Sequence, residues 1–408
     1  MKKFKSLLLC FLCTLAVSIV CSVNALAAST DPVDVPDTHL RSAILEKLEK
    51  NTDYTLTKDD MASFEILEVP DNNIVSLEGL QYCTELRKLD LSNNQVNSME
   101  QLKDLKNLMY VNLSNNKISA VPDLSNLNNL YSLYLDHNIL NSIDGIHDLP
   151  VLDDLTLSNN NLTTLEALKN IPELMYLQAS HNQITDISSL AAFKNLVIVE
   201  LYYNKISDIS ALANLSCLDE NLDLAYNNIS DITPLKNLTN LTYLCLSNNK
   251  ISDISTLHYL YKLDTLDLNN NNIEDVTPIS TLPNLVSLSL CNNKIYDAAS
   301  LANLPNKDFY YARLDDQRIN YRYPYYQYGT DDHYVTDYGW CYRHYMNNPI
   351  KPVNSDFRIK NVEGGCYYDS NNIIIAAPAR YVIFVFDFNE TIDVGNIKAS
   401  FSGRVTNK

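Results

Sequence analysis

The sequence predicts an α/β solenoid, in which stacked coils place a parallel sheet on a concave face and 3₁₀ turns on a convex face. Asparagine recurs every 22 residues, with one step of 23 residues, and each copy closes the phrase L-x-L-x-x-N-x-I. A fixed period with this phrase is the signature of leucine-rich repeats. The eleven asparagines that mark the coils are Asn72, Asn94, Asn116, Asn138, Asn160, Asn182, Asn204, Asn227, Asn249, Asn271 and Asn293.

Each element of a coil follows from the residue order. The two leucines of L-x-L share one side of a short strand, because side chains alternate along a strand, and they point into the solenoid. We expect the asparagine amide to satisfy backbone groups of the bend and to stack on the next coil, which is a structural role. Phrases such as Asp186-Ile187-Ser188 favour turns and short helical starts. Two leucines three residues apart, such as Leu238 and Leu241, then predict a 3₁₀ turn.

The single longer step falls between Leu218 and Leu222. The extra residue predicts a local bulge where the strand begins. Eleven parallel strands about 4.8 Å apart make a sheet on the order of 50 Å long, which is large enough to dock a protein.

The first 27 residues have the pattern of a secretory signal peptide, with Lys2, Lys3 and Lys5 before an apolar run and Ala25-Leu26-Ala27 at its end. No later stretch approaches the roughly 20 apolar residues that a membrane span requires. We therefore expect a secreted, extracellular protein, and association with the cell surface stays open.

The chain is strongly acidic, with 31 lysines and arginines against 49 aspartates and glutamates and a net charge of −18. Such a field repels nucleic acid, anionic membranes and anionic wall polymers, and it favours basic protein patches or cations. The acidic balance also serves solubility.

The sequence predicts no enzyme, no metal site and no cofactor. Beyond the predicted signal peptide it holds no C-x-x-C, and nowhere a G-x-S-x-G, H-E-x-x-H or glycine-rich phosphate loop, and it has only 8 glycines. His137 and His181 belong to the same column of the solenoid but lie two coils, roughly 10 Å, apart, too far to share a metal ion. Among the cysteines beyond the predicted signal peptide, only Cys341 and Cys366 fall in one small region and are candidates for a disulfide.

Both ends of the solenoid need covers for their apolar coils. Residues 29–65 predict a helical N-terminal cap, because Asp37 can cap a helix with Leu40, Ile44 and Leu48 on one face, and Thr57 can cap a second. The repeats extend over 66–317, and Ala312, Leu314 and Gln317 imitate a final half-coil. Strand-forming runs follow toward the end of the chain.

Several of these segments resemble bacterial internalin-like proteins. Val35-Pro36-Asp37 is similar to their cap, Leu314-Asp315-Asp316-Gln317 to their closing repeat, and Phe401-Ser402-Gly403-Arg404-Val405-Thr406 to the F-S-G-x-V-T ending of their adjacent domain. The resemblance covers nearly all of the mature chain and implies an immunoglobulin-like, all-β domain at 318–408. One departure is a tyrosine-rich insertion between Asn320 and Asn347, which is either a hairpin packed on the solenoid end or an aromatic platform for protein or sugar.

Side chains that flank the inward leucines face outward from the concave sheet, so the candidate contact residues can be identified from the sequence. Tyrosines cluster there in the middle coils, with many carboxylates and one firm positive charge, Lys88. Tyrosine offers a large, stiff contact area and is enriched at interface hot spots. The predicted partner-binding residues are Tyr110, Tyr134, Asp136, Tyr176, Glu200, Tyr202, Tyr203, Asp223, Tyr226 and Tyr243.

These observations predict an exported, monomeric, internalin-like protein whose concave face recognises a protein partner on a host or neighbouring cell. A basic patch on that partner would match the acidic surface. The alternative is a glycan-binding or wall-associated module that acts through the tyrosine-rich segment.

Overall fold

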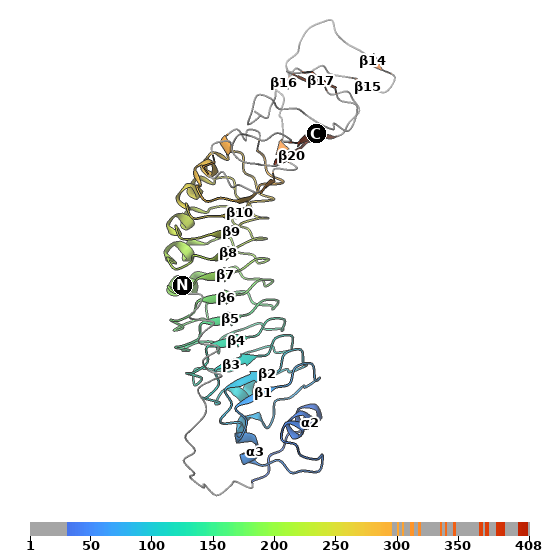
Figure 1. Cartoon of the computed structure of the whole chain (residues 1–408), viewed down its shortest axis with the longest axis vertical. Coiled ribbons are helices and arrows are strands. Elements are labelled where there is room, and N and C mark those ends of the chain that lie inside the picture. Colours follow the sequence, from blue (N-terminus) through green and yellow to red (C-terminus); the bar gives the residue numbers. More distant parts are fainter. Residues whose placement is uncertain are drawn as a thin grey trace.

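The protein is a curved solenoid with a small helical unit at its N-terminal end (Figure 1). A computed structural model describes residues 31–295, 300–301 and 304–305, and beyond these the backbone of strands between residues 311 and 406. Within the described part, no helix is both long enough and apolar enough to cross a membrane.

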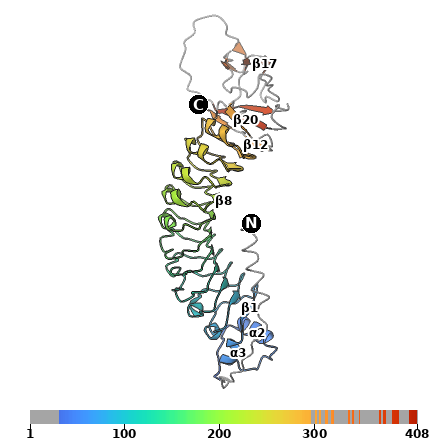
Figure 2. The same cartoon turned by 60° about the vertical axis from the view of Figure 1, so that its left-hand side comes forward.

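Each coil contributes one three-residue strand to a parallel sheet that lines the concave side (Figure 2). Neighbouring strands pair in register, so that Leu155 lies beside Leu177, and Leu177 beside Val199. The eleven strands of the repeats are β1 (Ile66–Glu68), β2 (Lys88–Asp90), β3 (Tyr110–Asn112), β4 (Ser132–Tyr134), β5 (Asp154–Thr156), β6 (Tyr176–Gln178), β7 (Ile198–Glu200), β8 (Asn221–Asp223), β9 (Tyr243–Cys245), β10 (Thr265–Asp267) and β11 (Ser287–Ser289).

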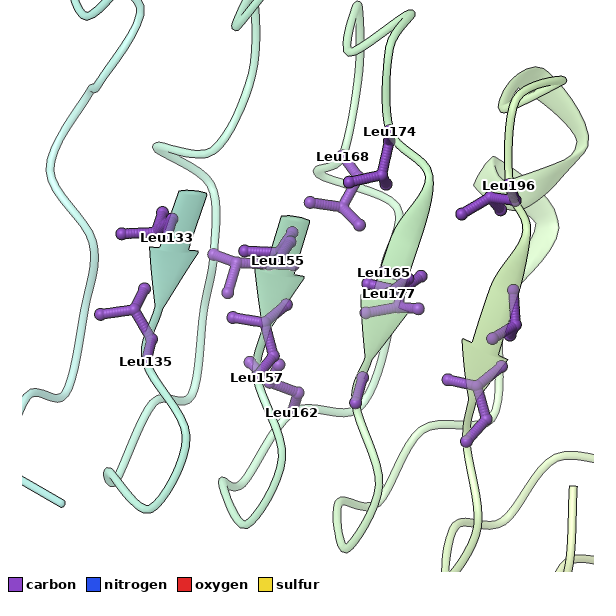
Figure 3. Close-up of a cluster of buried hydrophobic side chains, with 14 of the residues drawn as sticks. Leu133, Leu135, Leu155, Leu157, Leu162, Leu165, Leu168, Leu174, Leu177 and Leu196 are labelled. Atoms are coloured by element: carbon purple, nitrogen blue, oxygen red, sulfur yellow. The ribbon is translucent and has the colours of Figure 1, made fainter. Parts of the chain in front are cut away.

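The core is a stack of leucines and isoleucines that runs the length of the solenoid. Leu133, Leu135, Leu155 and Leu157 are fully buried, and Figure 3 shows how the leucines of successive coils pack against one another. One coil cannot bury its apolar side alone, so the coils stabilise each other by stacking. The predicted inward position of both L-x-L leucines is confirmed.

The predicted structural role of the repeating asparagine is also confirmed. The Asn160 side-chain amide donates to the carbonyl oxygens of Leu135 and Leu157, both at 3.0 Å, and its Oδ1 accepts from the Leu140 amide at 2.9 Å. Equivalent bonds recur at each repeat asparagine from Asn94 to Asn293. Each asparagine therefore joins its own bend to the coil before it.

The convex side differs between coils. Most described coils carry a 3₁₀ helix there: η1 (Leu80–Tyr82), η2 (Glu100–Leu102), η3 (Ser188–Ala192), η4 (Ser210–Asn214), η5 (Thr233–Asn237), η6 (Ser255–Tyr259) and η7 (Thr277–Thr281). Between η2 and η3 the chain instead forms turns and isolated parallel bridges, such as Ala120 with Ser142. A 3₁₀ turn in every coil was therefore the wrong expectation for this stretch.

Close backbone packing accounts for part of this difference. A Cβ on Gly145 would lie 1.9 Å from the Pro122 carbonyl oxygen, so adjacent coils approach more closely here than a side chain allows. An aspartate starts the turn of each helix from η3 to η7, as where Asp186 Oδ1 accepts from the Ser188 amide at 2.8 Å. The coils without a 3₁₀ helix have Ala120, Ser142 or Thr164 at this position, but η1 and η2 form with Ser76 and Ser98 there, so the aspartate alone does not decide the difference.

Two helices precede the first coil and begin at the residues predicted to cap them. Asp37 caps α2 (Thr38–Lys47), and Thr57 forms a capping box with Asp60 at the start of α3 (Lys58–Ala62). The second oxygen of Asp37 accepts from the Val75 and Ser76 amides at 2.7 and 3.0 Å. One carboxylate thus caps a helix and ties it to the first coil, and these backbone bonds lower its pKa although its partial burial acts to raise it.

The extra residue of the longer step lies at the start of β8, where the bulge was predicted. In a regular coil two successive amides, such as those of Val286 and Ser287, donate to a single carbonyl, that of Asp264. At the longer step the amides of Thr242 and Tyr243 donate to two carbonyls, those of Asp219 and Glu220. Strand pairing on both sides of β8 is unchanged.

Beyond the repeats, β12 (Tyr311–Arg313) extends the sheet and pairs with β20 (Ala399–Thr406), which also pairs with β13 (Gln317–Ile319) and β19 (Tyr381–Asp387). Short pairs join β14 (Val335–Thr336) to β15 (Gly339–Trp340), and β18 (Asn372–Ile374) to β16 (Met346–Asn347) and β17 (Tyr367–Asp369). The predicted signal peptide, the Cys341 to Cys366 pair and most of the tyrosine-rich insertion lie outside the described residues.

Candidate functional site

The candidate site is the concave surface, formed by the strand residues that flank each central leucine and by the turn that follows each strand. All ten predicted partner-binding residues have this placement, and none of them is buried. Lys88 is the one lysine or arginine within β1 to β11. The structure divides the predicted residues into groups with different chemistry.

One group lies toward the N-terminal end. Lys88 Nζ is 5.3 Å from the centre of the Tyr110 ring, and Tyr110 meets Tyr134 edge to face with ring centres 5.3 Å apart. The Tyr134 hydroxyl donates to Asp154 Oδ2 at 2.5 Å. Burial and this bond raise the pKa of Tyr134, and burial raises the pKa of Asp154. The Tyr134 hydroxyl and the Asp154 carboxylate already bond to each other, so this group offers mainly ring surface to a partner.

Carboxylates dominate the middle of the surface. Glu200 and Asp223 lie side by side on β7 and β8. Burial raises the pKa of both, and the charge of Asp223 raises that of Glu200 further. Burial, followed by the charges of Asp154 and Glu173, raises the pKa of Asp153 to about 6. These acids are half-buried, and a neighbouring carboxylate opposes ionisation of Glu200, beside Asp223, and of Asp153, beside Asp154.

The remaining predicted residues are held by their neighbours. Asp136 Oδ1 accepts from the Thr156 hydroxyl at 2.5 Å and from the Ser114 hydroxyl at 3.1 Å. Burial, together with the nearby Cys245 and Asp223, raises the pKa of Tyr243 to about 12. Burial also raises the pKa of Tyr176, and the negative charge of Glu220, which lies in the bulge before β8, raises it further.

An aromatic column lies at the turns that follow β6, β7 and β8. The His181 and Tyr203 rings stack with centres 4.5 Å apart, and those of Tyr203 and Tyr226 with centres 3.9 Å apart. Tyr202 stands edge-on to His181 at 5.1 Å. Sequence analysis predicted the three tyrosines but left out His181, because stacking between coils is not visible in a single repeat.

The structure also adds residues that the sequence prediction missed. Asp154 was not among the predicted residues, yet it accepts the hydrogen bond of the Tyr134 hydroxyl. Asn221 donates from its side-chain amide to Glu200 Oε1 at 3.1 Å. Its position beside the longer step was a signal that could have identified it, because an irregular coil presents a different residue to the surface.

The arrangement suits binding. Among the described residues, no three histidine, cysteine, aspartate or glutamate side chains are placed to hold a metal ion. What the surface offers is aromatic area, carboxylate oxygens and few cations, a combination that fits a basic partner.

Family comparisons agree with this architecture. Residues 84–140 and 129–184 match the family described as leucine rich repeat. Residues 172–214, 220–257 and 261–306 match the family described as leucine rich repeats (2 copies). No curated protein matches the chain.

Solved structures include close matches in fold. An internalin of Listeria monocytogenes (InlF) is 31% identical, with 68% of this chain and 96% of that chain covered and a TM-score of 0.50. A leucine-rich repeat protein of Leptospira interrogans is 26% identical, with 65% and 68% covered and a TM-score of 0.57. A plant peptide hormone receptor in complex with RGF2 shares the fold at 23% identity, with 65% and 46% covered and a TM-score of 0.56. The chain therefore belongs to the internalin-like leucine-rich repeat proteins.

Proposed function

We propose that this protein is exported and recognises a protein on a host or neighbouring cell through its concave surface, as a monomer and without catalysis. Its repeats support a role in protein interaction, since internalin-like and receptor-like proteins share the solenoid. The plant peptide hormone receptor of this fold was solved in complex with RGF2, an analogy at the level of fold alone.

The observation that carries the proposal is the combination of accessible tyrosines and half-buried carboxylates on one continuous sheet. Core aromatic residues would occupy the leucine positions, and these tyrosines do not. Crowded carboxylates destabilise one another until a cation approaches. A basic protein surface would supply that cation and cover the rings at the same time.

The test is capture of a surface protein from cell extracts by the mature protein. The variant Tyr134→Ala/Tyr176→Ala/Tyr202→Ala removes three rings from three strands or their turns. We expect affinity for the captured protein to fall at least roughly a hundredfold, because tyrosines that a partner covers in an interface are typical hot spots. Binding should also weaken as salt is raised.

Tyr259→Ala/Tyr261→Ala is the matched control. Both tyrosines are exposed, at 39% and 48%, and lie at or just after η6 on the convex side. This control should bind like the unmodified protein. If the triple variant bound as tightly as the unmodified protein, the concave tyrosines would not be part of the binding site.

The glycan-binding alternative depends on residues 320–347, most of which lie outside the described part. Capture of a carbohydrate that depends on this segment, and not on the concave tyrosines, would favour it.

A further inference from the structure

The aromatic column occupies a strained backbone position. The residue just before each repeat asparagine adopts a left-handed conformation, with φ between 52° and 57° from Asn93 to Asn292. Asparagine tolerates this conformation best among residues with side chains, and it fills the position in most coils. His137 breaks the pattern once, and His181, Tyr203 and Tyr226 break it in three successive coils. Strain that is kept in this way points to a gain elsewhere.

That gain is not burial of the rings. Tyr203 and Tyr226 each remain 42% exposed, and they stack nearly parallel, with 10° between their planes. The asparagine-bearing turns of later coils have the same backbone conformation, so the solenoid does not require rings here. The column is a preformed aromatic surface that faces solvent.

Hydrogen-bond acceptors lie beside this column. Glu200 is two residues before Tyr202, so both side chains face the same way with Cα atoms about 7 Å apart. Asp223 pairs with Glu200 across the sheet. Asn221 Oδ1 is buried and has no hydrogen-bond partner within the described structure. Two like charges side by side and an unused acceptor destabilise the free protein, unless a ligand rich in donors binds there.

We propose that the column, together with Glu200, Asn221 and Asp223, is a preformed site for the guanidinium group of an arginine in a basic segment of the partner. A guanidinium group is planar and stacks on tyrosine faces, and its five donors match the clustered acceptors. A lysine ammonium group lacks the planar face, and a sugar lacks the positive charge that would relieve the carboxylate pair. This inference rests on the proposed function and specifies its chemistry.

The experiment measures binding of a fluorescently labelled hexa-arginine peptide to the mature protein by anisotropy, with hexalysine and hexacitrulline peptides for comparison. We expect hexa-arginine to bind several-fold more tightly than hexalysine, and hexacitrulline not to bind. Equal affinity for hexa-arginine and hexalysine would overturn the proposal, because it would show diffuse charge attraction alone.

The decisive variant is Tyr203→Asn/Tyr226→Asn, which installs the residue that other coils use at this position. It should fold with an unchanged or higher Tm and lose roughly tenfold in hexa-arginine affinity. Glu200→Gln should also weaken binding, whereas Glu166→Gln on an exposed convex turn should not. Unchanged peptide affinity in the tyrosine variant, or a large fall in its Tm, would assign the rings a merely structural role.

The two proposals can fail separately. If protein capture depends on Tyr134 and Tyr176 while hexa-arginine shows no preference, the arginine site is wrong and the concave surface stands. If hexa-arginine binds as expected but no surface protein is captured through this face, the proposed function is wrong.

Discussion

Two sets of turns share one backbone conformation and differ in what they display. After β6, β7 and β8 the left-handed residue is His181, Tyr203 or Tyr226, whereas after β9, β10 and β11 it is Asn248, Asn270 or Asn292. The repeat asparagine that follows makes the same backbone bonds in both sets. The comparison separates two tasks: the repeat asparagine maintains the solenoid, and the residue before it is free to serve the surface.

The largest loss of stability is expected when the repeat asparagine itself is substituted. Asn204→Ala removes one of the two asparagine donors from each of the Ala179 and Leu201 carbonyls and leaves the Ile184 amide without its acceptor. An unsatisfied buried group costs about 1 to 3 kcal/mol and each lost hydrogen bond about 1 kcal/mol, so we expect about 3 kcal/mol of lost stability in urea unfolding. Tyr203→Asn, one residue away, should lose none. Equal losses in the two variants would contradict the separation of tasks.

An intermediate effect is expected for the acidic middle of the surface. The folded protein raises the pKa of Asp153 to about 6, so the carboxyl favours folding while protonated and disfavours it once ionised. Stability from this group is therefore present at low pH and lost as the pH rises through about 6. Asp153→Asn should raise stability at pH 8 by on the order of 1 kcal/mol, after allowance for solvent screening.

The pH dependence provides the check. Melting curves of Asp153→Asn and the unmodified protein should differ at pH 8 and converge toward pH 4, where both side chains are neutral. A difference that stays constant with pH would mean that repacking, and not charge, separates the two proteins.

The smallest effect comes from exchanging the two kinds of turn. Asn248→Tyr would add a fourth ring beyond Tyr226 and place a tyrosine in the strained conformation. We expect a loss of about 1 kcal/mol in unfolding free energy and a gain of a few-fold in hexa-arginine affinity. Asn292→Tyr, which does not adjoin the column, is the control and should show the loss without the gain.

Most of the fold could be predicted because residues close in the sequence determine the structure of each coil. The spacing of leucines and asparagine specifies one turn of chain, and stacking repeats it, so the inward leucines, the asparagine bonds and the bulge before β8 were all anticipated. The convex side was less predictable. At Gly145 the backbone of the neighbouring coil at Pro122 comes closer than a side chain allows, and one repeat gives no sign of such a contact.

The outward columns of the candidate site also followed from alternation along each strand, which placed Glu200, Asp223 and the tyrosines on the surface. The missed residues, such as His181 and Asn221, owe their place to partners 21 or 22 positions away in the sequence. One repeat gives no information about ring stacking between coils.

By itself, the sequence determined a solenoid with a buried leucine side, a bonded asparagine row and an acidic, tyrosine-bearing face, because all of these follow from a short period and side-chain direction. Only the tertiary structure decided which rings stack, which carboxylates crowd each other and which turns carry strain. Those properties arise between coils, where a few ångströms set both the stacking of Tyr203 on Tyr226 and the repulsion between Glu200 and Asp223.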